Sequence, residues 1–140
     1  MPFVSITRLR VRSWRYLPAF LVNAYRAARQ AKRARGNLAI SLLRDADFAF
    51  WTRTIWTDET EMRAFMLSGV HRRIMSRLPV WCDEAAVAHW LQDDLEPPSW
   101  PEAWRRLRQD GRPSMVKYPS EAQRRFELPE PRTTAELRLK

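Results

Sequence analysis

Residues 48–71, FAFWTRTIWTDETEMRAFMLSGVH, decide the fold, because the hydrophobic period changes from two to about 3.6 within this one stretch. Every second residue from Phe48 to Trp56 is aromatic or β-branched, which is the period of a strand. Asp58 precedes Glu61 by three residues, a variant of the capping box that begins helices. Apolar residues then continue at helical spacing, so this stretch predicts a strand followed directly by a helix.

Similar patterns extend the prediction to both sides of this stretch. In chain order, the predicted elements are a strand at 3–11, a helix at 17–35, strands at 37–44 and 48–56, a helix that Asp58 begins and Ser68-Gly69 interrupts, a short helix at 71–78 that stops near Pro79, and a strand at 86–92. The short connection at 44–47 makes the second and third strands a hairpin. Gly36 follows the first helix at the position where helices favour glycine.

The predicted order, β–α–β–β–α–β, indicates an α+β ferredoxin-like fold with an antiparallel sheet. We expect this domain to occupy residues 1–94, followed over 95–140 by a C-terminal helix at 101–109 and an extended or partly disordered arm from Arg112. Helices on one face of four strands leave the other face uncovered. A second subunit commonly covers such a face, so we expect a homodimer with a largely apolar interface.

Composition excludes several classes of protein. The chain has 140 residues, 45% of them hydrophobic, with 7 Trp and 6 Phe, which excludes a disordered protein and favours a single domain. Cys82 is the only cysteine, so an internal disulfide is excluded. Only His71 and His89 could join it as nitrogen or sulfur ligands, so we expect no metal site. No apolar run has the length of a membrane span.

Positive charge is concentrated at the start of the chain. The net charge is +9, and the first 44 residues contain ten basic residues and no acidic residue. Such a segment is typical of a surface that binds nucleic acid or anionic lipid, and also of a solvated helix face. Arginines stand where a secretory signal would be apolar, and the lone thiol suits a reducing compartment, so we expect a cytoplasmic protein.

Few residues have the chemistry of a site. His71 follows a helix break and could act as a general base, or it could only cap a helix or bond a backbone carbonyl. Ser5 and Thr7 share one face of a strand and could offer hydroxyls to a ligand. His89, in the middle of a strand, is expected to be a buried histidine with its hydrogen bonds satisfied. Cys82 is expected to be structural.

The stretch from strand 48–56 to His71 resembles the antibiotic biosynthesis monooxygenase-like proteins, whose fold is a dimeric α/β barrel. The shared features are a Trp that ends a strand (Trp56), an acidic helix start, an aromatic residue within the helix (Phe65), and then a Ser and a His (Ser68 and His71). The resemblance covers about residues 3–92 and is more specific for the fold than for an activity.

This resemblance implies a cavity between the sheet and the helices, lined by Thr7, Trp56, Phe65 and His71, that binds a small apolar or aromatic molecule. It implies a monooxygenase-like activity without a cofactor, in which His71 takes a proton from an electron-rich aromatic substrate. The haem-degrading branch of the family has different residues at the positions of Thr7 and Phe65. Two alternatives remain: binding of nucleic acid or anionic lipid by the basic segment, and a dimeric scaffold without chemistry.

Overall fold

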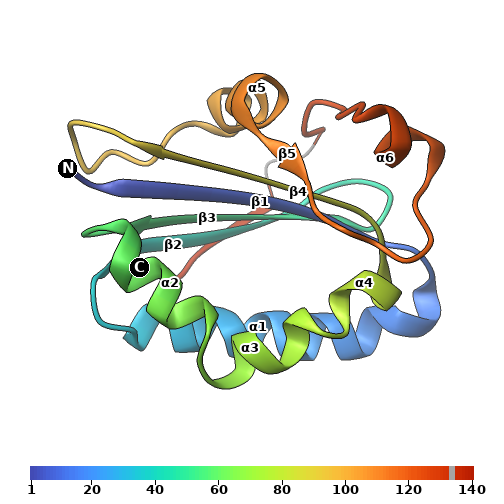
Figure 1. The fold of residues 1–140 in the computed structure, drawn as a ribbon, viewed down its shortest axis with the longest axis horizontal. Coiled ribbons are helices and arrows are strands. Elements are labelled where there is room, and N and C mark those ends of the chain that lie inside the picture. Colours follow the sequence, from blue (N-terminus) through green and yellow to red (C-terminus); the bar gives the residue numbers. More distant parts are fainter. Residues whose placement is uncertain (133–134) are drawn as a thin grey trace.

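A six-stranded antiparallel sheet lies between two layers of helices in the part of the chain that the structure describes (Figure 1). The structure is a computed structural model, and it describes residues 1–132 and 135–140. The strand order is β5-β4-β1-β3-β2-β6. The strands are β1 (Phe3–Val11), β2 (Asn37–Arg44), β3 (Ala49–Trp56), β4 (Cys82–Leu91), β5 (Arg112–Pro113) and β6 (Ala135–Arg138).

The four longer strands form the predicted ferredoxin-like core. β1 pairs with β3 on one side and with β4 on the other, and β2 pairs with the far side of β3, all antiparallel. The α+β ferredoxin-like fold is therefore confirmed, although the sheet does not close into a barrel. β3 begins one residue later than predicted, because Asp47 and Phe48 have positive φ angles of 59° and 65° and belong to the turn of the β2–β3 hairpin.

One face of the sheet is covered by four α-helices: α1 (Leu17–Arg33), α2 (Glu59–Met66), α3 (Gly69–Met75) and α4 (Leu78–Trp81). A short 3₁₀ helix, η1 (Trp14–Tyr16), precedes α1. The predicted cap of α2 is present, with the Asp58 carboxylate accepting a hydrogen bond of 2.9 Å from the Glu61 backbone N–H. Pro79 was predicted to stop a helix. Instead it lies in the first turn of α4, where its missing N–H costs no hydrogen bond.

β4 begins at Cys82, four residues before the predicted start. The sequence pattern obscures this part of the strand because Asp83 and Glu84 are typical of a loop. In the structure, Glu84 is buried and accepts hydrogen bonds from Arg8 at 2.8 Å and Arg10 at 3.1 Å on the neighbouring strand. The acidic residues therefore belong to the strand because β1 supplies their counter-charges.

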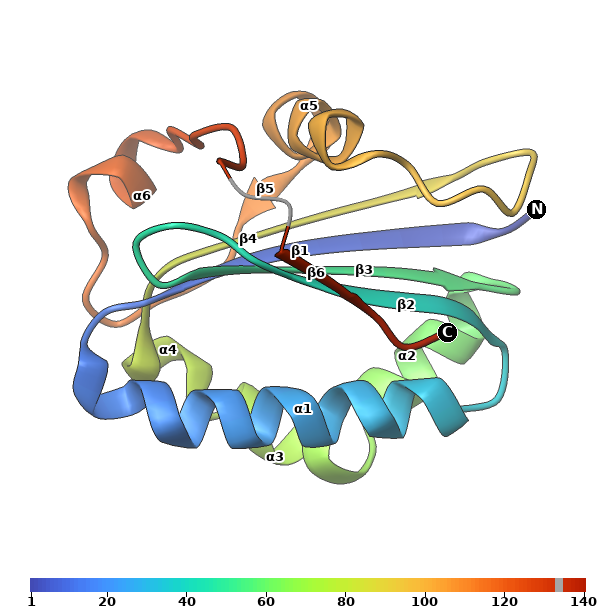
Figure 2. The ribbon, with the colours of Figure 1, turned by 180° about the vertical axis from the view of Figure 1, so that it is seen from behind.

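The opposite face of the sheet is covered by the chain's own C-terminal part. α5 (Trp100–Asp110) crosses this face, with α6 (Glu121–Arg125) beside it (Figures 1 and 2). Ala103 and Leu107 of α5 are fully buried against the apolar side chains of the sheet, among them Trp51. The sequence analysis predicted that a second subunit covers this face. That assignment is wrong, because the face is already buried within one chain.

The segment after α5 is built into the same sheet. β5 pairs with β4 and β6 pairs with β2, so the expected arm extends both edges of the sheet. The buried Gln123 side chain fixes α6 in place by three hydrogen bonds of 3.0 Å, to the Ala85 N–H, the Ala85 carbonyl and the Ser114 carbonyl. Residues 133–134 of the arm lie outside the described residues. None of the described helices combines the length and hydropathy that a membrane span requires.

Candidate functional site

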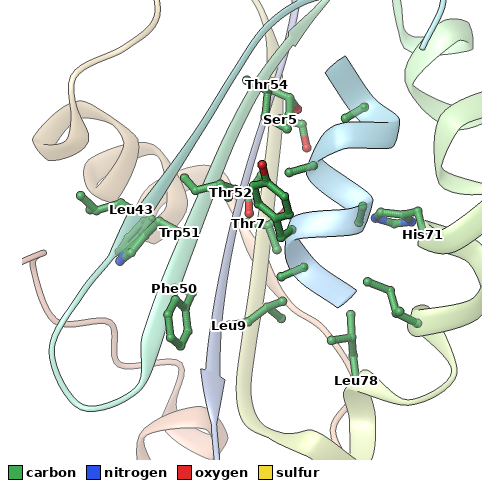
Figure 3. A pocket seen from close by; sticks show the side chains of 18 of the residues that line it. Ser5, Thr7, Leu9, Leu43, Phe50, Trp51, Thr52, Thr54, His71 and Leu78 are labelled. Carbon is green, nitrogen blue, oxygen red and sulfur yellow. The ribbon is translucent and has the colours of Figure 1, made fainter. Parts of the chain in front are cut away.

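A cavity of about 430 Å³ lies between the sheet and the helices α1, α2 and α3. Its walls are mostly apolar, and the residues that line it come from both layers (Figure 3). All five side chains that the sequence analysis singled out line this one cavity: Ser5, Thr7, Trp56, Phe65 and His71. The structure thus brings together residues that lie up to 66 positions apart in the sequence, from 5 to 71.

Four hydroxyl groups lie together on the sheet side of the cavity. Ser5 is directly opposite Thr54, and Thr7 is directly opposite Thr52, in the antiparallel pairing of β1 with β3. Figure 3 shows the four side chains grouped on these strands. None of the four hydroxyls has a hydrogen-bond partner among the described residues. We call these four residues the hydroxyl patch; it is a polar spot that can donate or accept hydrogen bonds within an apolar cavity.

His71 lies on the helical side of the cavity. Its ring extends from α3 toward the strands (Figure 3). Its Nδ1 is 3.2 Å from the Met66 carbonyl oxygen, and its backbone N–H donates to the Gln30 side-chain oxygen at 2.9 Å. With Nδ1 donating to Met66, Nε2 carries the lone pair of the neutral ring. Burial lowers the pKa of His71, against the smaller opposing effect of the Met66 hydrogen bond.

An aromatic stack joins His71 to the sheet. The ring of Phe65 stacks on that of Trp56, with the ring centroids 5.2 Å apart and the planes inclined by 30°. The same Phe65 ring contacts the His71 ring, with the two ring centroids 4.7 Å apart. Trp56 is fully buried, and its indole nitrogen has no hydrogen-bond partner in the described part of the chain. The stack fixes the position of the imidazole and supplies a flat apolar wall.

His89 is a cavity residue that the sequence analysis missed. It lines the cavity beside Ser5, the residue that it pairs with on β1. Its ring contacts the ring of Phe3, with the two ring centroids 5.2 Å apart. Burial, followed by the positive charge of Arg112, lowers its pKa. It was expected to have satisfied hydrogen bonds, yet its ring has none to any described residue. Apolar residues lie on both faces of its strand, so the sequence pattern alone could not tell which face borders the cavity.

The other candidates for chemistry have structural environments. Trp51 packs in the cluster on the opposite face of the sheet from Trp56, although it also lines the edge of the cavity, and its indole N–H donates to Asp45 at 3.1 Å. Cys82 is buried, and burial followed by the charge of Asp83 raises its pKa to about 12, so the sulfur is a thiol and a poor nucleophile. Among residues 1–132 and 135–140, no cluster of His, Cys, Asp or Glu suits a metal ion.

The arrangement of cavity, helices and C-terminal cover has counterparts in known proteins. The model of a domain of unknown function, DUF3291, matches residues 18–118, which is from α1 to beyond β5. The chain belongs to the DUF3291 family. The match includes α5, so the helix that covers the second face of the sheet lies within the part that defines the DUF3291 family. No curated protein matches the chain.

Solved structures similar to this DUF3291 protein include antibiotic biosynthesis monooxygenase-like proteins. SnoaB, a cofactor-independent oxygenase from Streptomyces nogalater, is 17% identical with a TM-score of 0.56, and the match covers 69% of this chain and 98% of SnoaB. A putative antibiotic biosynthesis monooxygenase from Nitrosomonas europaea is 17% identical with a TM-score of 0.58, over 70% of this chain and 94% of its own. Rv0793 from Mycobacterium tuberculosis is 12% identical with a TM-score of 0.62, and the match covers 69% of this chain and 100% of Rv0793.

These similarities confirm that the DUF3291 chain has the fold of the antibiotic biosynthesis monooxygenase-like proteins, as the sequence resemblance implied. Nearly the whole of each neighbour matches, but about 30% of this chain lies outside the match. At this level of identity the similarity is one of fold.

Proposed function

We propose that the cavity binds a small apolar or aromatic molecule and that His71 acts as a base toward it in a cofactor-independent oxygenation. One observation carries the proposal: a half-buried histidine with a lowered pKa faces an apolar cavity of about 430 Å³ whose other polar groups are mainly hydroxyls. A cavity of this size lined by apolar walls, with a few polar groups at fixed positions, is typical of small-molecule sites. The oxygenase title of SnoaB, a neighbour of the same fold, agrees with this chemistry.

In the proposed reaction, Nε2 of His71 takes one proton from an acidic ring CH2, as in an anthrone-like ketone or the keto form of a reduced phenol; the second hydrogen of that carbon is lost later with water. The resulting carbanion gives one electron to dioxygen, and the radical pair combines to a hydroperoxide after a proton returns. Loss of water from the hydroperoxide leaves a carbonyl on the ring. A neutral histidine suits the first step, because a base must be deprotonated at the working pH. The hydroxyl patch can bind the ring oxygens of the substrate.

The test is oxygen uptake with a panel of reduced phenols, quinols and anthrone-like ketones. We expect consumption by the wild-type chain and at least a hundredfold slower consumption by His71→Gln, which removes the base. His89→Gln is the matched control, because it changes a second cavity histidine and should retain most of the activity. Thr7→Val should raise KM more than it lowers kcat, since it removes a binding hydroxyl. No uptake with any compound, together with unchanged ligand binding by His71→Gln, would contradict the proposal.

Homodimerisation also belongs to the proposal. Because α5 covers the apolar face of the sheet, a dimer would need a different surface from the one first predicted. Native mass spectrometry of the full chain reports the mass of the assembly.

A cytoplasmic location remains a proposal as well, and it rests on the charge pattern and the lone buried thiol.

A further inference from the structure

The part of the helical layer that η1, α1, α3 and α4 form has positive charge without acidic residues. Residues 11–44 and 62–82 contain η1, α1, α3 and α4, and neither segment contains an Asp or a Glu. In both ribbon views α1 and α3 lie together on the side of the sheet away from α5 (Figures 1 and 2). We define the basic helical face by six exposed cations on these two helices: Arg26, Arg29, Lys32, Arg33, Arg72 and Arg73.

The cations of this face have no acidic partners among the described residues. The ion pairs of the described residues lie elsewhere: between strands, at the ends of α1 and α2, on α5 and α6, and between Arg132 and the β2–β3 turn. Arginines on α5 illustrate the contrast, since Arg105 and Arg106 each pair with Glu102. An uncompensated cluster of like charges is held together only by the fold, so it favours an anionic partner.

Apolar side chains are exposed among these cations. On α1, Leu21, Val22 and Tyr25 are 43%, 52% and 47% exposed, and Trp14 of the preceding η1 is 71% exposed. A helix that presents Leu, Val and Tyr next to Arg and Lys is typical of helices that lie in the interface of a bilayer. Exposed Trp and Tyr are also favoured at that depth.

The cavity reaches the surface at this same helix. Leu21 and Tyr25 of α1 line the cavity and are also exposed to solvent. Leu137 of β6, 49% exposed, lines the cavity as well. The residues that are shared between the cavity wall and the surface mark its mouth, which therefore lies between α1 and β6. Figure 2 shows these two elements on the same side of the molecule. The mouth is thus bordered by the apolar residues that lie among the cations of α1.

We propose that the basic helical face docks on an anionic lipid bilayer, with the mouth of the cavity at the lipid interface. The cations would bind lipid phosphates, and Val22, Tyr25 and Trp14 would enter the headgroup region. A nucleic acid would use the cations equally well, but it would leave the exposed aliphatic side chains and the apolar mouth without a partner. The combination therefore favours lipid. Docking on a bilayer is a property separate from the proposed oxygenation. It can therefore be tested without any substrate in the cavity.

The experiment is sedimentation of the full chain with vesicles of phosphatidylcholine, with and without added phosphatidylglycerol. The test variant replaces Arg26, Arg29 and Arg33 of α1 by Gln, and the control replaces Arg105, Arg124 and Arg125 of α5 and α6 by Gln. Both lose three charges from exposed positions, on opposite sides of the sheet. We expect binding only to the anionic vesicles, weakened about tenfold or more in the test variant and retained in the control.

A second variant separates lipid from other anionic partners. Val22→Ser removes an exposed apolar side chain that does not line the cavity, and it should weaken vesicle binding without changing the net charge. Absence of binding to anionic vesicles, or an equal loss in the test and control variants, would overturn the proposal. So would salt-sensitive binding of a DNA oligonucleotide in the absence of vesicle binding. Circular dichroism of each variant verifies that the fold is retained.

Discussion

At the scale of single residues, the cavity is lined by two histidines whose pKa values are lowered. His71 and His89 lie on opposite layers, one on the helical side and one on the sheet, and burial is the main cause of the lowered pKa in both. Burial therefore favours the neutral form of both side chains. The sequence identified His71 because it follows a helix break, whereas His89 became a cavity residue only through its place beside Ser5 in the sheet.

These histidines predict how stability depends on pH. The unfolded chain titrates both near the ordinary value of about 6.5, and the folded chain titrates them at lower pH. Below pH 6.5 the unfolded state binds more protons, so the free energy of unfolding falls as the pH is lowered; above it the histidines contribute no slope. Each can add up to about 1.4 kcal/mol per pH unit.

Urea unfolding at a series of pH values between neutral and mildly acidic measures this slope. The double variant His71→Gln/His89→Gln should have a flatter dependence than the wild type in this range. An identical dependence in the two proteins would show that the histidines titrate alike in the folded and unfolded chains.

Much of the fold at the scale of elements follows from the period of the sequence. Strands β1, β2 and β3 and helices α1 and α2 have clear periods of two or 3.6, and Asp58 marks the start of α2. The start of β4 could not be predicted, because its acidic residues require arginines from a distant strand. Strands β5 and β6 are too short to show any period, and they form only because β4 and β2 offer free edges.

The pair between β1 and β4 provides a test of that explanation. Arg8 and Glu84 are 3% and 5% exposed, and their side chains are 2.8 Å apart. Burial raises the pKa of Glu84, but the hydrogen bonds from Arg8 and Ser120 outweigh it and lower the pKa overall. Glu84→Ala leaves the buried arginine without its main partner and should cost about 3–5 kcal/mol of unfolding free energy.

Glu121→Ala is the control for this measurement, because it removes an exposed pair with Arg125 and should cost less than about 1 kcal/mol. Denaturant unfolding compares the two variants. Equal and small losses would mean that Glu84 does not hold the first residues of β4 in the sheet.

The side-chain amide of Gln123 is one of the groups that attach α6 to the sheet. Gln123→Ala removes three hydrogen bonds and leaves the Ala85 and Ser114 backbone groups without that partner, so we expect a loss of about 1–3 kcal/mol. The exposed Gln109 on α5 is the matched control. Hydrogen exchange should show faster exchange in α6 for Gln123→Ala and no change for Gln109→Ala. Unchanged exchange in α6 would contradict this assignment.

The C-terminal segment determines what the whole molecule can bind. By covering the sheet face that includes Trp51, α5 leaves the helical layer as the side with the cavity mouth and the unpaired cations. A chain that ends at residue 94 would expose the apolar side chains that Ala103 and Leu107 now cover. We expect this truncated chain to self-associate or precipitate, which light scattering measures. A monodisperse monomer would show that α5 is not needed as a cover.

Native mass spectrometry can show whether the cavity holds a small apolar or aromatic molecule. The full chain, purified gently from its own host, is compared with Ala24→Phe, which fills the cavity from α1. We expect an additional small mass on the wild-type chain that is absent from the variant, with both proteins folded by circular dichroism. An unliganded wild-type chain that also fails to take up any added aromatic compound, or an equal additional mass on both proteins, would contradict the claim.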